Sequence, residues 1–382
     1  MVVQASRQDE LLAYASHEPT PEAAVAEIAR IAAKARLGSG LVFCSSNFDR
    51  QELAQQFNRH FPDLALVGCT SAGELTQQGY DEDSLLFIGF PEEEFTLTSL
   101  RFTDLDHLDV VQAQAQIRRL VADARRRDPA AMHVAMIFVD GLSHREELLA
   151  MIAQEALGDV ELIGGSSGDA LAFRDTAVLH EGEFHRQAAV IALLSSQRPL
   201  HAFCSTHYRA GAQKMVVTQA DAASRTVYEI NAEPAAQAYR RLIGIESGPL
   251  DALTFAAHPP MVRIGGRYHV RSIQSVNPDD SLTFYCAIDA GIVLTIGEPV
   301  NRLAELDELF AACEKAVGPV DKIIGFDCVL NRIDAAQHQI SRQISALYVD
   351  HHVYGFNTYG EQFRSAHMNQ TFSGLAIGQR RA

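Results

Sequence analysis

The feature of the sequence that most constrains its fold is an order of elements that occurs twice in the first half. A short apolar strand, a helix, a second strand, a turn of small residues and a further apolar strand are expected over residues 41–90 and again over residues 134–194. The two turns match, as Gly-Cys-Thr-Ser-Ala-Gly-Glu at 68–74 and Gly-Gly-Ser-Ser-Gly-Asp at 164–169. We infer two related β-α-β units that share one sheet, with helices covering a face.

The two small-residue turns follow sheet strands, and ligands of open α/β sheets usually bind at such places. Sharp turns need Gly and Ser for conformational reasons alone, and that is a sufficient explanation for one turn. Two matched turns that each end in an acid favour a shared ligand crevice. The side chains expected to line it are Thr70, Ser71, Glu74, Ser166, Ser167 and Asp169, together with Glu361 from the C-terminal stretch.

Length and composition indicate two domains, because 382 residues, 47% of them hydrophobic, are too many for one typical core. The net charge of -16 argues against nucleic acid and anionic membranes as partners. No apolar run approaches the ~20 residues of a transmembrane helix, and residues 1–10 lack a signal pattern. The six cysteines show no CxxC spacing, so we expect a reduced, cytoplasmic protein.

Three motifs resemble functional signatures without the context that these need. Residues 164–168 fit G-x-S-x-G, but no helix is expected after them and no His-Asp pair is evident, so a serine hydrolase is not predicted. His180 and His185 are five positions apart across a Gly turn, which indicates a hairpin tip rather than a metal motif. The arginines between residues 118 and 127 are the exposed face of an amphipathic helix. We therefore expect no enzyme.

The remaining patterns define the domains. Residues 20–215 are expected to form an N-terminal domain built from the two units, and residues 216–380 a C-terminal domain with a mostly antiparallel sheet and flanking helices. The predicted fold class is thus α/β to α+β. Residues 1–17 look like a flexible lead-in, and residues 255–262 look like a strand that ends at His258, which two prolines follow.

A stretch near the C-terminus is unusually mixed. Residues 353–363 alternate apolar and aromatic side chains with Gly, Asn and Thr, and a His and an Asn-Gln-Thr trio follow within a few positions. A pocket wall would need such a mixture, because rings supply area and fixed polar groups supply orientation. An aromatic core strand that ends in a polar turn explains the same residues equally well.

Seven segments, taken together and in order, resemble the FIST family of sensory proteins. They are residues 68–74, 138–142, 164–169, 258–259, 268–273, 326–328, and 354–361 with 369–371. The resemblance covers nearly the whole chain and implies an N-terminal and a C-terminal FIST domain that sense a small ligand in signal transduction. The length and the C-terminal motifs are also similar to a bacterial FIST subgroup that binds haem, senses nitric oxide and regulates partner histidine kinases.

That resemblance implies haem b as the cofactor, and haem iron needs an axial ligand such as His, Cys, Tyr or Met. His258 is the first candidate, His367 the second, and Cys328 a third as its thiolate. A capping or core role explains each single His or buried Cys as well. Further expected haem contacts are ring stacking by Phe356 and Tyr359 and a propionate contact by Arg271, whose fork suits carboxylates.

In this interpretation, nitric oxide on the ferrous iron weakens the axial bond, and the surface that a kinase contacts changes as a population shift. The rival interpretation is a haem-free FIST module that senses a small polar metabolite such as an amino acid, because Glu74 and Asp169 suit an ammonium group and hydroxyls. An enzyme that uses Ser166 or Glu361 is disfavoured, since no base and nucleophile pair is recognisable. A homodimer is the candidate assembly.

Overall fold

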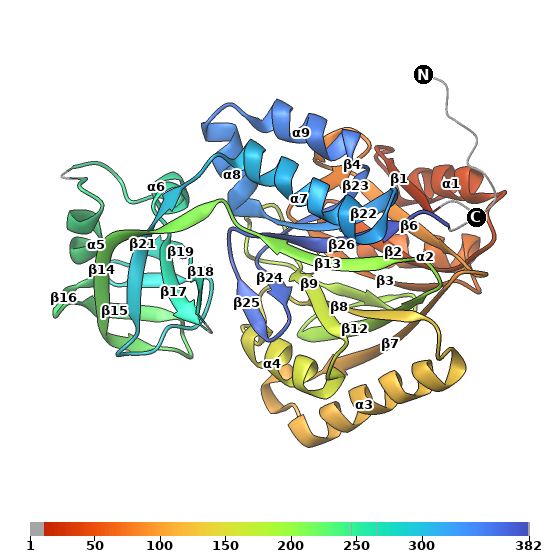
Figure 1. The fold of residues 1–382 in the computed structure, drawn as a ribbon, viewed down its shortest axis with the longest axis horizontal. Coiled ribbons are helices and arrows are strands. Elements are labelled where there is room, and N and C mark those ends of the chain that lie inside the picture. The colour runs from red at the N-terminus through yellow and green to blue at the C-terminus, as the bar shows by residue number, and fades with distance from the viewer. Residues whose placement is uncertain (1–10, 246, 265, 381–382) are drawn as a thin grey trace.

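The computed structural model describes residues 11–245, 247–264 and 266–380. Within them, one order of elements occurs three times: strand, helix, strand, helix, strand, hairpin, strand, with two helices in place of the second one in the third copy. The chain is therefore a mixed α/β protein, as predicted, but a third repeat accompanies the two units that the sequence suggested (Figure 1).

Repeat 1 occupies residues 12–91. Thr20 caps its first helix, where its side chain accepts a hydrogen bond from the Ala23 N–H, and Pro21 stands at the first helical position. Residues 12–16, predicted as part of a flexible lead-in, are instead an edge strand, and residues 1–10 lie outside the described part. The elements are β1 (Leu12–Ser16), α1 (Pro21–Ala32), β2 (Leu37–Ser45), α2 (Arg50–His60), β3 (Ala65–Ser71), β4 (Glu74–Thr76), β5 (Gly79–Asp81) and β6 (Leu85–Pro91).

Repeat 2 occupies residues 95–196. The arginine-rich segment is an amphipathic helix, as predicted, with Ile117 and Val121 buried and the arginines exposed. The elements are β7 (Phe95–Thr103), the short helix η1 (Leu105–His107), α3 (Val110–Arg127), β8 (Met132–Val139), α4 (Glu146–Leu157), β9 (Glu161–Ser166), β10 (Val178–His180), β11 (Glu183–His185) and β12 (Ala188–Ser196).

Repeat 3 is interrupted after its first strand and resumes at residue 302. Its elements are β13 (Leu200–Ser205), α7 (Arg302–Val317), β22 (Val320–Cys328), α8 (Val329–Gln337), α9 (Ser341–Asp350), β23 (Val353–Thr358), β24 (Glu361–Phe363), β25 (Ala366–Met368) and β26 (Phe372–Gly378). The predicted domain boundary at residues 215 and 216 falls inside the inserted segment, and the C-terminal strands return to the body formed by the three repeats.

The insertion, residues 208–299, forms a separate lobe beside the body (Figure 1). Its core is an eight-stranded, antiparallel sheet. The elements are β14 (Tyr208–Asp221), β15 (Thr226–Ile230), β16 (Glu233–Pro234), α5 (Ala235–Leu242), α6 (Ala252–Ala257), β17 (Pro260–Ile264), β18 (Arg267–Val270), β19 (Ile273–Val276), β20 (Leu282–Phe284) and β21 (Val293–Pro299). His258 ends helix α6, so the prediction that it ends a strand is wrong.

Each repeat has its own sheet, so the prediction that the two units share one sheet is wrong. The strands of each repeat pair in the same way when they are counted along the chain and the hairpin is left out. The second strand (β2, β8 or β22) is parallel to the third and antiparallel to the last, and the last strand is antiparallel to the first. Each hairpin leaves its own repeat. Hairpin β4–β5 joins the sheet of repeat 3, β10–β11 joins that of repeat 1, and β24–β25 joins that of repeat 2.

The core lies where the three sheets meet. Phe43, Phe138 and Phe326 hold equivalent positions on β2, β8 and β22, and their ring centroids are 5.6, 6.0 and 6.4 Å apart. Such edge-to-face contacts add stability to the burial of ring area. Phe356, from β23, stacks on Phe43 with ring centroids 4.6 Å apart and fills the centre of this triad.

Candidate functional site

A seam is defined here as the contact between a donated hairpin and the helix of the repeat that receives it. Hairpin β10–β11 packs against α2 at seam 1, β4–β5 packs against α9 at seam 2, and β24–β25 packs against α4 at seam 3. The three seams are equivalent in the order of their elements, so a residue at one seam has a counterpart at the other two.

At seams 1 and 2, the facing residues of the hairpin are apolar or aromatic. The cross-strand pair is Leu179 with Phe184 at seam 1, and Leu75 with Tyr80 at seam 2. Each pair packs against the apolar side chains beneath the helices of the receiving repeat, which is the usual way to bury one face of a hairpin. These pairs show what the fold requires at this position.

At seam 3 the equivalent pair is Gln362 with His367. Both side chains are as deeply buried as a core residue, with 0% and 2% of their surface exposed. The Gln362 Nε2 atom lies 2.9 Å from His367 Nδ1 and donates to the Ser166 Oγ atom at 3.0 Å. A polar pair thus replaces the pair of a leucine and an aromatic residue at seam 3 only. The other two seams show that the fold forms without a polar pair at this position.

The polar pair is incompletely satisfied. Within the described residues, the Nε2 atom of His367, the Oε1 atom of Gln362 and the Nδ2 atom of nearby Asn369 are buried and have no hydrogen-bond partner. Gly360 lies between two of them, since a Cβ added there would come within 2.8 Å of His367 Nε2 and 3.0 Å of Asn369 Nδ2. Unpaired buried polar groups cost about 1–3 kcal/mol each, so their presence calls for a function.

The lobe covers seam 3. Arg271 donates to the main-chain carbonyl of His367, and the Ser272 N–H donates to Asn369 Oδ1 at 3.3 Å. The Ser272 hydroxyl also donates to the Gln370 side chain at 2.9 Å. Burial lowers the pKa of His367, so its ring is neutral at pH 7 and one of its nitrogens is free to accept or donate a hydrogen bond.

A buried ion cluster lies between the lobe and the start of α4. Arg225, from the lobe, donates to Glu146 at 2.6 Å and to Glu147 at 2.8 Å, and the Ala287 N–H donates to Glu147 at 2.9 Å. Burial acts to raise the pKa of Glu147, but the Arg225 guanidinium and this amide act in the opposite direction and hold that pKa below its usual value. We call these two glutamates and Arg225 the clamp.

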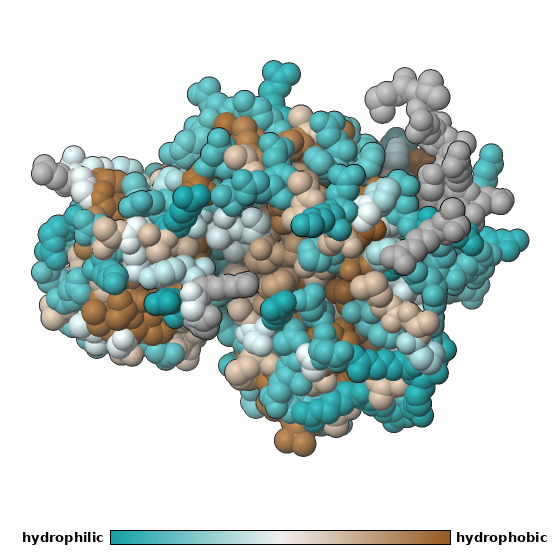
Figure 2. Space-filling view, in the orientation of Figure 1, coloured by the Kyte–Doolittle hydropathy of each residue, from teal (hydrophilic) through white to brown (hydrophobic). Residues whose placement is uncertain are grey.

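An open cavity of about 460 Å³ adjoins the clamp. Its lining includes Glu147 and Arg225 together with Ser143, His144 and Arg145 from the body. This volume suits a small polar molecule. The space-filling view shows a notch between the lobe and the end of the body that carries α3 and α4 (Figure 2).

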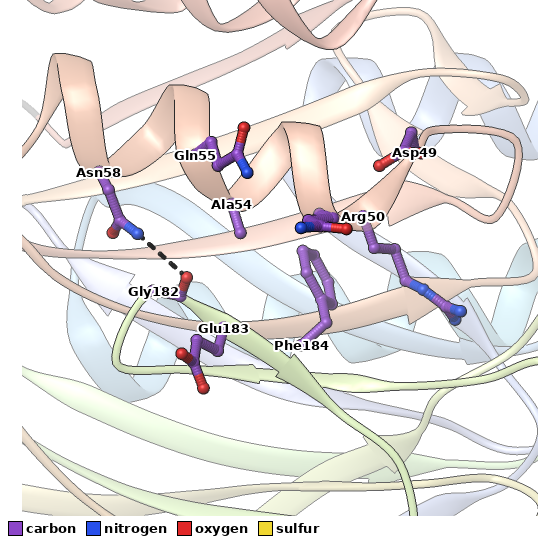
Figure 3. Close-up of a pocket in the computed structure, with 9 residues that line it drawn as sticks. Asp49, Arg50, Ala54, Gln55, Asn58, Gly182, Glu183 and Phe184 are labelled. Carbon is purple, nitrogen blue, oxygen red and sulfur yellow. Dashed lines mark hydrogen bonds between the residues drawn. The ribbon is translucent and has the colours of Figure 1, made fainter.

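Open clefts lie at the other two seams, with volumes of about 570 Å³ at seam 1 and about 730 Å³ at seam 2. Phe184 rises from the hairpin toward α2 at seam 1, where Asn58 donates to the Gly182 carbonyl at 3.2 Å (Figure 3). Tyr80 is the equivalent lining residue at seam 2. Seam 3 differs from both because the lobe occupies this place.

The seven residues predicted to line a crevice meet at the centre of the body, where the turns of the repeats join cyclically. The Ala72 N–H donates to the Asn357 carbonyl, the Gly168 N–H to the Thr70 carbonyl, and the Tyr359 N–H to the Ser166 carbonyl. All seven are buried, and their side-chain oxygens bind one another, nearby backbone groups or neighbouring side chains. They are Thr70, Ser71, Glu74, Ser166, Ser167, Asp169 and Glu361.

Two of these residues are buried carboxyl groups at equivalent positions. Burial raises the pKa of Glu74 to about 7, although hydrogen bonds from Ser71 and Ser84 act in the opposite direction. Burial likewise raises the pKa of Glu361 to about 8, against the hydrogen bonds of two threonines. The equivalent residue in repeat 2 is Val178, so the pair is not required by the fold.

An insertion distinguishes the turn of repeat 2. Residues 167–177 separate β9 from the hairpin of repeat 2, whereas only two residues, 72–73 and 359–360, separate the strand from the hairpin in repeats 1 and 3. The Asp169 carboxylate accepts the Arg174 and Asp175 N–H groups at 2.7 and 2.8 Å, and the Tyr359 hydroxyl donates to it. Phe173 stacks on Tyr359 with ring centroids 4.7 Å apart, and this contact ties the insertion to repeat 3.

The residues predicted to hold haem do not form one site. Phe356 fills the aromatic centre, Tyr359 holds the insertion, and Cys328 is buried with a raised pKa. His258, half-buried at the end of α6, has no side-chain hydrogen bond in the described residues, while Arg271 is bound to the His367 carbonyl. A porphyrin could not contact this set without dismantling the core, so the set does not fit haem.

His367 and Arg271, predicted as haem contacts, lie at seam 3, as does Asn369 of the predicted pocket-wall stretch. Gln362, Glu146, Glu147 and Arg225 were not among the predicted site residues. The signal for Gln362 was available, because the turn Gly-Phe-Asn-Thr-Tyr-Gly-Glu at 355–361 matches the turn at 68–74 in both glycines and the final Glu. Aligning the two would have placed a Gln opposite Leu75. The clamp residues carry no local signal, since Arg225 meets the glutamates only in the fold.

Family comparison places two models on the chain. The FIST N domain model matches residues 39–233, and the FIST C domain model matches residues 235–364. The chain has no significant match among curated proteins. None of the helices in the described ranges is long and apolar enough to cross a membrane. Among the same residues, no group of three or more His, Cys, Asp or Glu side chains is placed to hold a metal ion.

Proposed function

Because the chain belongs to the FIST family of signal-transduction sensor domains, we propose that it senses a small polar metabolite, such as an amino acid, at seam 3. The observation that carries this proposal is the buried pair of Gln362 and His367, which replaces the Leu and aromatic pair of the other seams. Proteins keep such unfavourable groups where function needs them.

The chemistry of seam 3 supports a ligand with both donor and acceptor groups. Gln362 offers an unpaired acceptor, Asn369 an unpaired donor, and His367 a ring nitrogen that serves either purpose. The clamp carries two carboxylates against the guanidinium of Arg225, and Arg271 adds a second guanidinium nearby. These charges balance, so a net neutral ligand such as a zwitterion suits the seam.

The proposed role is binding rather than catalysis, in a cytoplasmic protein that passes the ligand signal to a signalling partner. A histidine kinase is the partner that the subgroup resemblance suggests. Ligand binding changes the output only if the ligand prefers one conformation of the protein, so the affinity for the kinase must differ between the free and the bound form.

Thermal unfolding in the presence of individual L-amino acids tests the ligand class. A ligand at 100 times its Kd stabilises a protein by about 2.7 kcal/mol, which raises the Tm measurably. The double variant Gln362→Leu with His367→Phe gives seam 3 the residues of seam 1 and should lose this response. Phe184→Leu at seam 1 is the matched control and should keep it. A response that survives in the double variant would place the ligand elsewhere.

A haem-based nitric oxide sensor is the second candidate, and the unpaired, buried Nε2 atom of His367 favours it. This haem interpretation uses neither Phe356 nor Cys328, both of which are buried in apolar clusters. An absorbance spectrum of protein from haem-replete cells decides. A Soret band that shifts with nitric oxide and disappears in His367→Ala would support haem, and a colourless protein that haemin does not reconstitute would exclude it.

A further inference from the structure

The proposed ligand groups of seam 3 are closed to solvent. Gln362 and Asn369 have no exposed surface, and His367 exposes 2%. The cavity beside the clamp reaches Glu147 and Arg225, but the lining does not include these three residues. A ligand that binds them must therefore enter after part of the protein has moved, and the lobe is the part that covers them.

The lobe is joined to the body by two neighbouring chain segments. One runs from β13 into β14 and the other from β21 into α7, and they lie side by side, since the Val300 N–H donates to the His207 carbonyl at 2.8 Å. Tyr208 begins the first strand of the lobe, Pro299 ends its last strand, and these two residues pair with each other. Two adjacent crossings of this kind form a hinge about which a domain can rotate.

The clamp lies at the other end of β14 from this hinge. Arg225 follows the turn after β14, and it reaches the first turn of α4 in the body. Its side chain is almost entirely buried between Glu146 and the lobe. Buried ion pairs of this kind are costly to open, because each separated charge must be hydrated again. Further links between the lobe and the body near seam 3 include the hydrogen bonds of Arg271 and Ser272, the contact of His269 with Met368, and the bond from Gln370 to the Ala256 carbonyl. Tyr285 of the lobe also packs in an apolar cluster with residues of the body.

We propose that the lobe opens on this hinge to admit the ligand to seam 3, and that the clamp sets the fraction of molecules that are open. The inference rests on the ligand site proposed above and adds its regulation. The measured association constant is the association constant of the open form multiplied by the fraction of molecules that are open. A weaker clamp raises this fraction, so both the association rate and the association constant should rise. The clamp residues therefore set how readily a ligand reaches seam 3, in addition to balancing the charge there.

A native thiol reports on the opening. Cys286 lies in the lobe next to Ala287, is fully buried, and is near Arg271 and Glu147. In a Cys204→Ser background, which removes the one partly exposed thiol of the described chain, its labelling by a thiol reagent reports movement of the lobe. Because Cys286 also packs in the apolar cluster of the lobe itself, unchanged amide exchange at Met215 and Val217 of that cluster distinguishes opening of the lobe from its unfolding. Mass spectrometry identifies the labelled peptide, and the buried core thiols of Cys44 and Cys313 serve as internal references for global unfolding.

The test variant replaces the clamp with neutral residues of similar size, Glu146→Gln, Glu147→Gln and Arg225→Met. Removing all the charges together avoids leaving one buried and unpaired. We expect Cys286 to label about tenfold faster, as a shift of about 1.4 kcal/mol in the opening equilibrium gives, while the reference thiols stay unchanged. The matched control is the exposed ion pair between Arg125 on α3 and Asp159 in the loop after α4, changed as Arg125→Met with Asp159→Asn. This control should not change the labelling rate of Cys286.

The outcomes separate this inference from the proposed function. Unchanged labelling of Cys286 in the clamp variant overturns the gate even if an amino acid binds. Faster labelling together with an equally faster association of the amino acid found by thermal unfolding supports it. Faster labelling with an unchanged association rate also overturns the gate, because the ligand then enters by another route. If no amino acid binds the original protein or the clamp variant, the proposed ligand class is wrong. The labelling of Cys286 still decides in that case whether the clamp controls the opening of the lobe.

Discussion

Seam 1 and seam 3 have the same architecture and opposite chemistry. Leu179 and Phe184 face α2 at seam 1, and Gln362 and His367 face α4 at seam 3. Seam 1 opens to solvent although its pair is apolar, whereas seam 3 is covered by a lobe although its pair is polar. The comparison separates what the fold requires from what function has added, because the repeats act as internal controls for one another.

The largest expected loss of stability comes from changing the equivalent core glycines of the three repeats, and it tests whether the repeats are built alike. Gly68, Gly164 and Gly355 pair with the neighbouring parallel strand at the same register, and a Cβ at any of them would overlap a carbonyl oxygen of that strand. Each Gly→Ala change should cost at least about 3 kcal/mol, because backbone atoms cannot move aside cheaply. Chemical denaturation measures it.

The control for the glycine series is Gly318→Ala, at φ 78° with open space around the position. It should cost about 1–3 kcal/mol from backbone conformation alone, because φ 78° with ψ −154° is a conformation that almost only Gly adopts. If one of the three core glycines tolerates Ala as well as Gly318 does, that repeat is not built like the others.

The second prediction concerns the buried glutamates of repeats 1 and 3, which repeat 2 lacks. The pKa values of Glu74 and Glu361 are raised from 4.5 to about 7 and about 8, so the folded protein holds their protons more tightly than the unfolded chain. Their contribution is fully present below pH 4.5 and is lost as the pH rises to 8, by about 3 kcal/mol or more for each. Urea unfolding across this pH range measures it.

The double variant Glu74→Gln with Glu361→Gln should flatten this part of the pH profile, because the amides keep the hydrogen-bonding shape and do not titrate. A profile that stays equally steep in the variant would assign the pH dependence to other groups.

The third prediction exchanges the chemistry of the two seams. Leu179→Gln with Phe184→His places the polar pair at seam 1 and should destabilise the protein by about 2–3 kcal/mol, because Leu179 is buried in an apolar cluster. The reverse exchange at seam 3 should stabilise by about 1–2 kcal/mol. Denaturation midpoints measure both changes, and destabilisation by the seam 3 exchange would mean that the polar pair is structural.

The smallest expected effect concerns the insertion of repeat 2. Tyr359→Phe removes the hydroxyl that donates to Asp169 and accepts the Leu171 N–H at 2.8 Å, while it keeps the ring that stacks on Phe173. The cost should be about 1 kcal/mol, and amide exchange should accelerate within residues 170–176. The turn of repeat 1 has Ala72 at this position and provides the internal reference. Uniform acceleration in both turns would contradict a local role.

Local sequence patterns predicted much of the fold. The cap at Thr20, the two early units and the amphipathic helix at 110–127 follow from capping chemistry and periodicity, which act within a few residues. The number of sheets did not follow, because strand order depends on contacts between distant segments. Hairpin β4–β5 pairs with β23, in which Gly355 lies 280 positions after its partner Leu75, and no local pattern predicts such a distant pairing.

The candidate site was predicted in part for the same reason. His367 stood out in a mixed polar and aromatic stretch, but its significance depends on comparison with Phe184 and Tyr80, which requires the repeats to be aligned. His258 looked special because two prolines follow it, yet these end a helix of the lobe. The rings of the closing stretch proved to be core packing, the alternative that the sequence left open for them.

The exchanged hairpins have a consequence for how the chain reaches its folded state. Repeat 1 receives β10–β11 from repeat 2, repeat 2 receives β24–β25 from repeat 3, and repeat 3 receives β4–β5 from repeat 1. No repeat can finish its sheet alone, and the first cannot place its own hairpin until residues 353–358 have been synthesised. The ring of repeats therefore closes only when repeat 3 joins the other two, and a chain that stops before that strand should remain open and prone to aggregation on the ribosome.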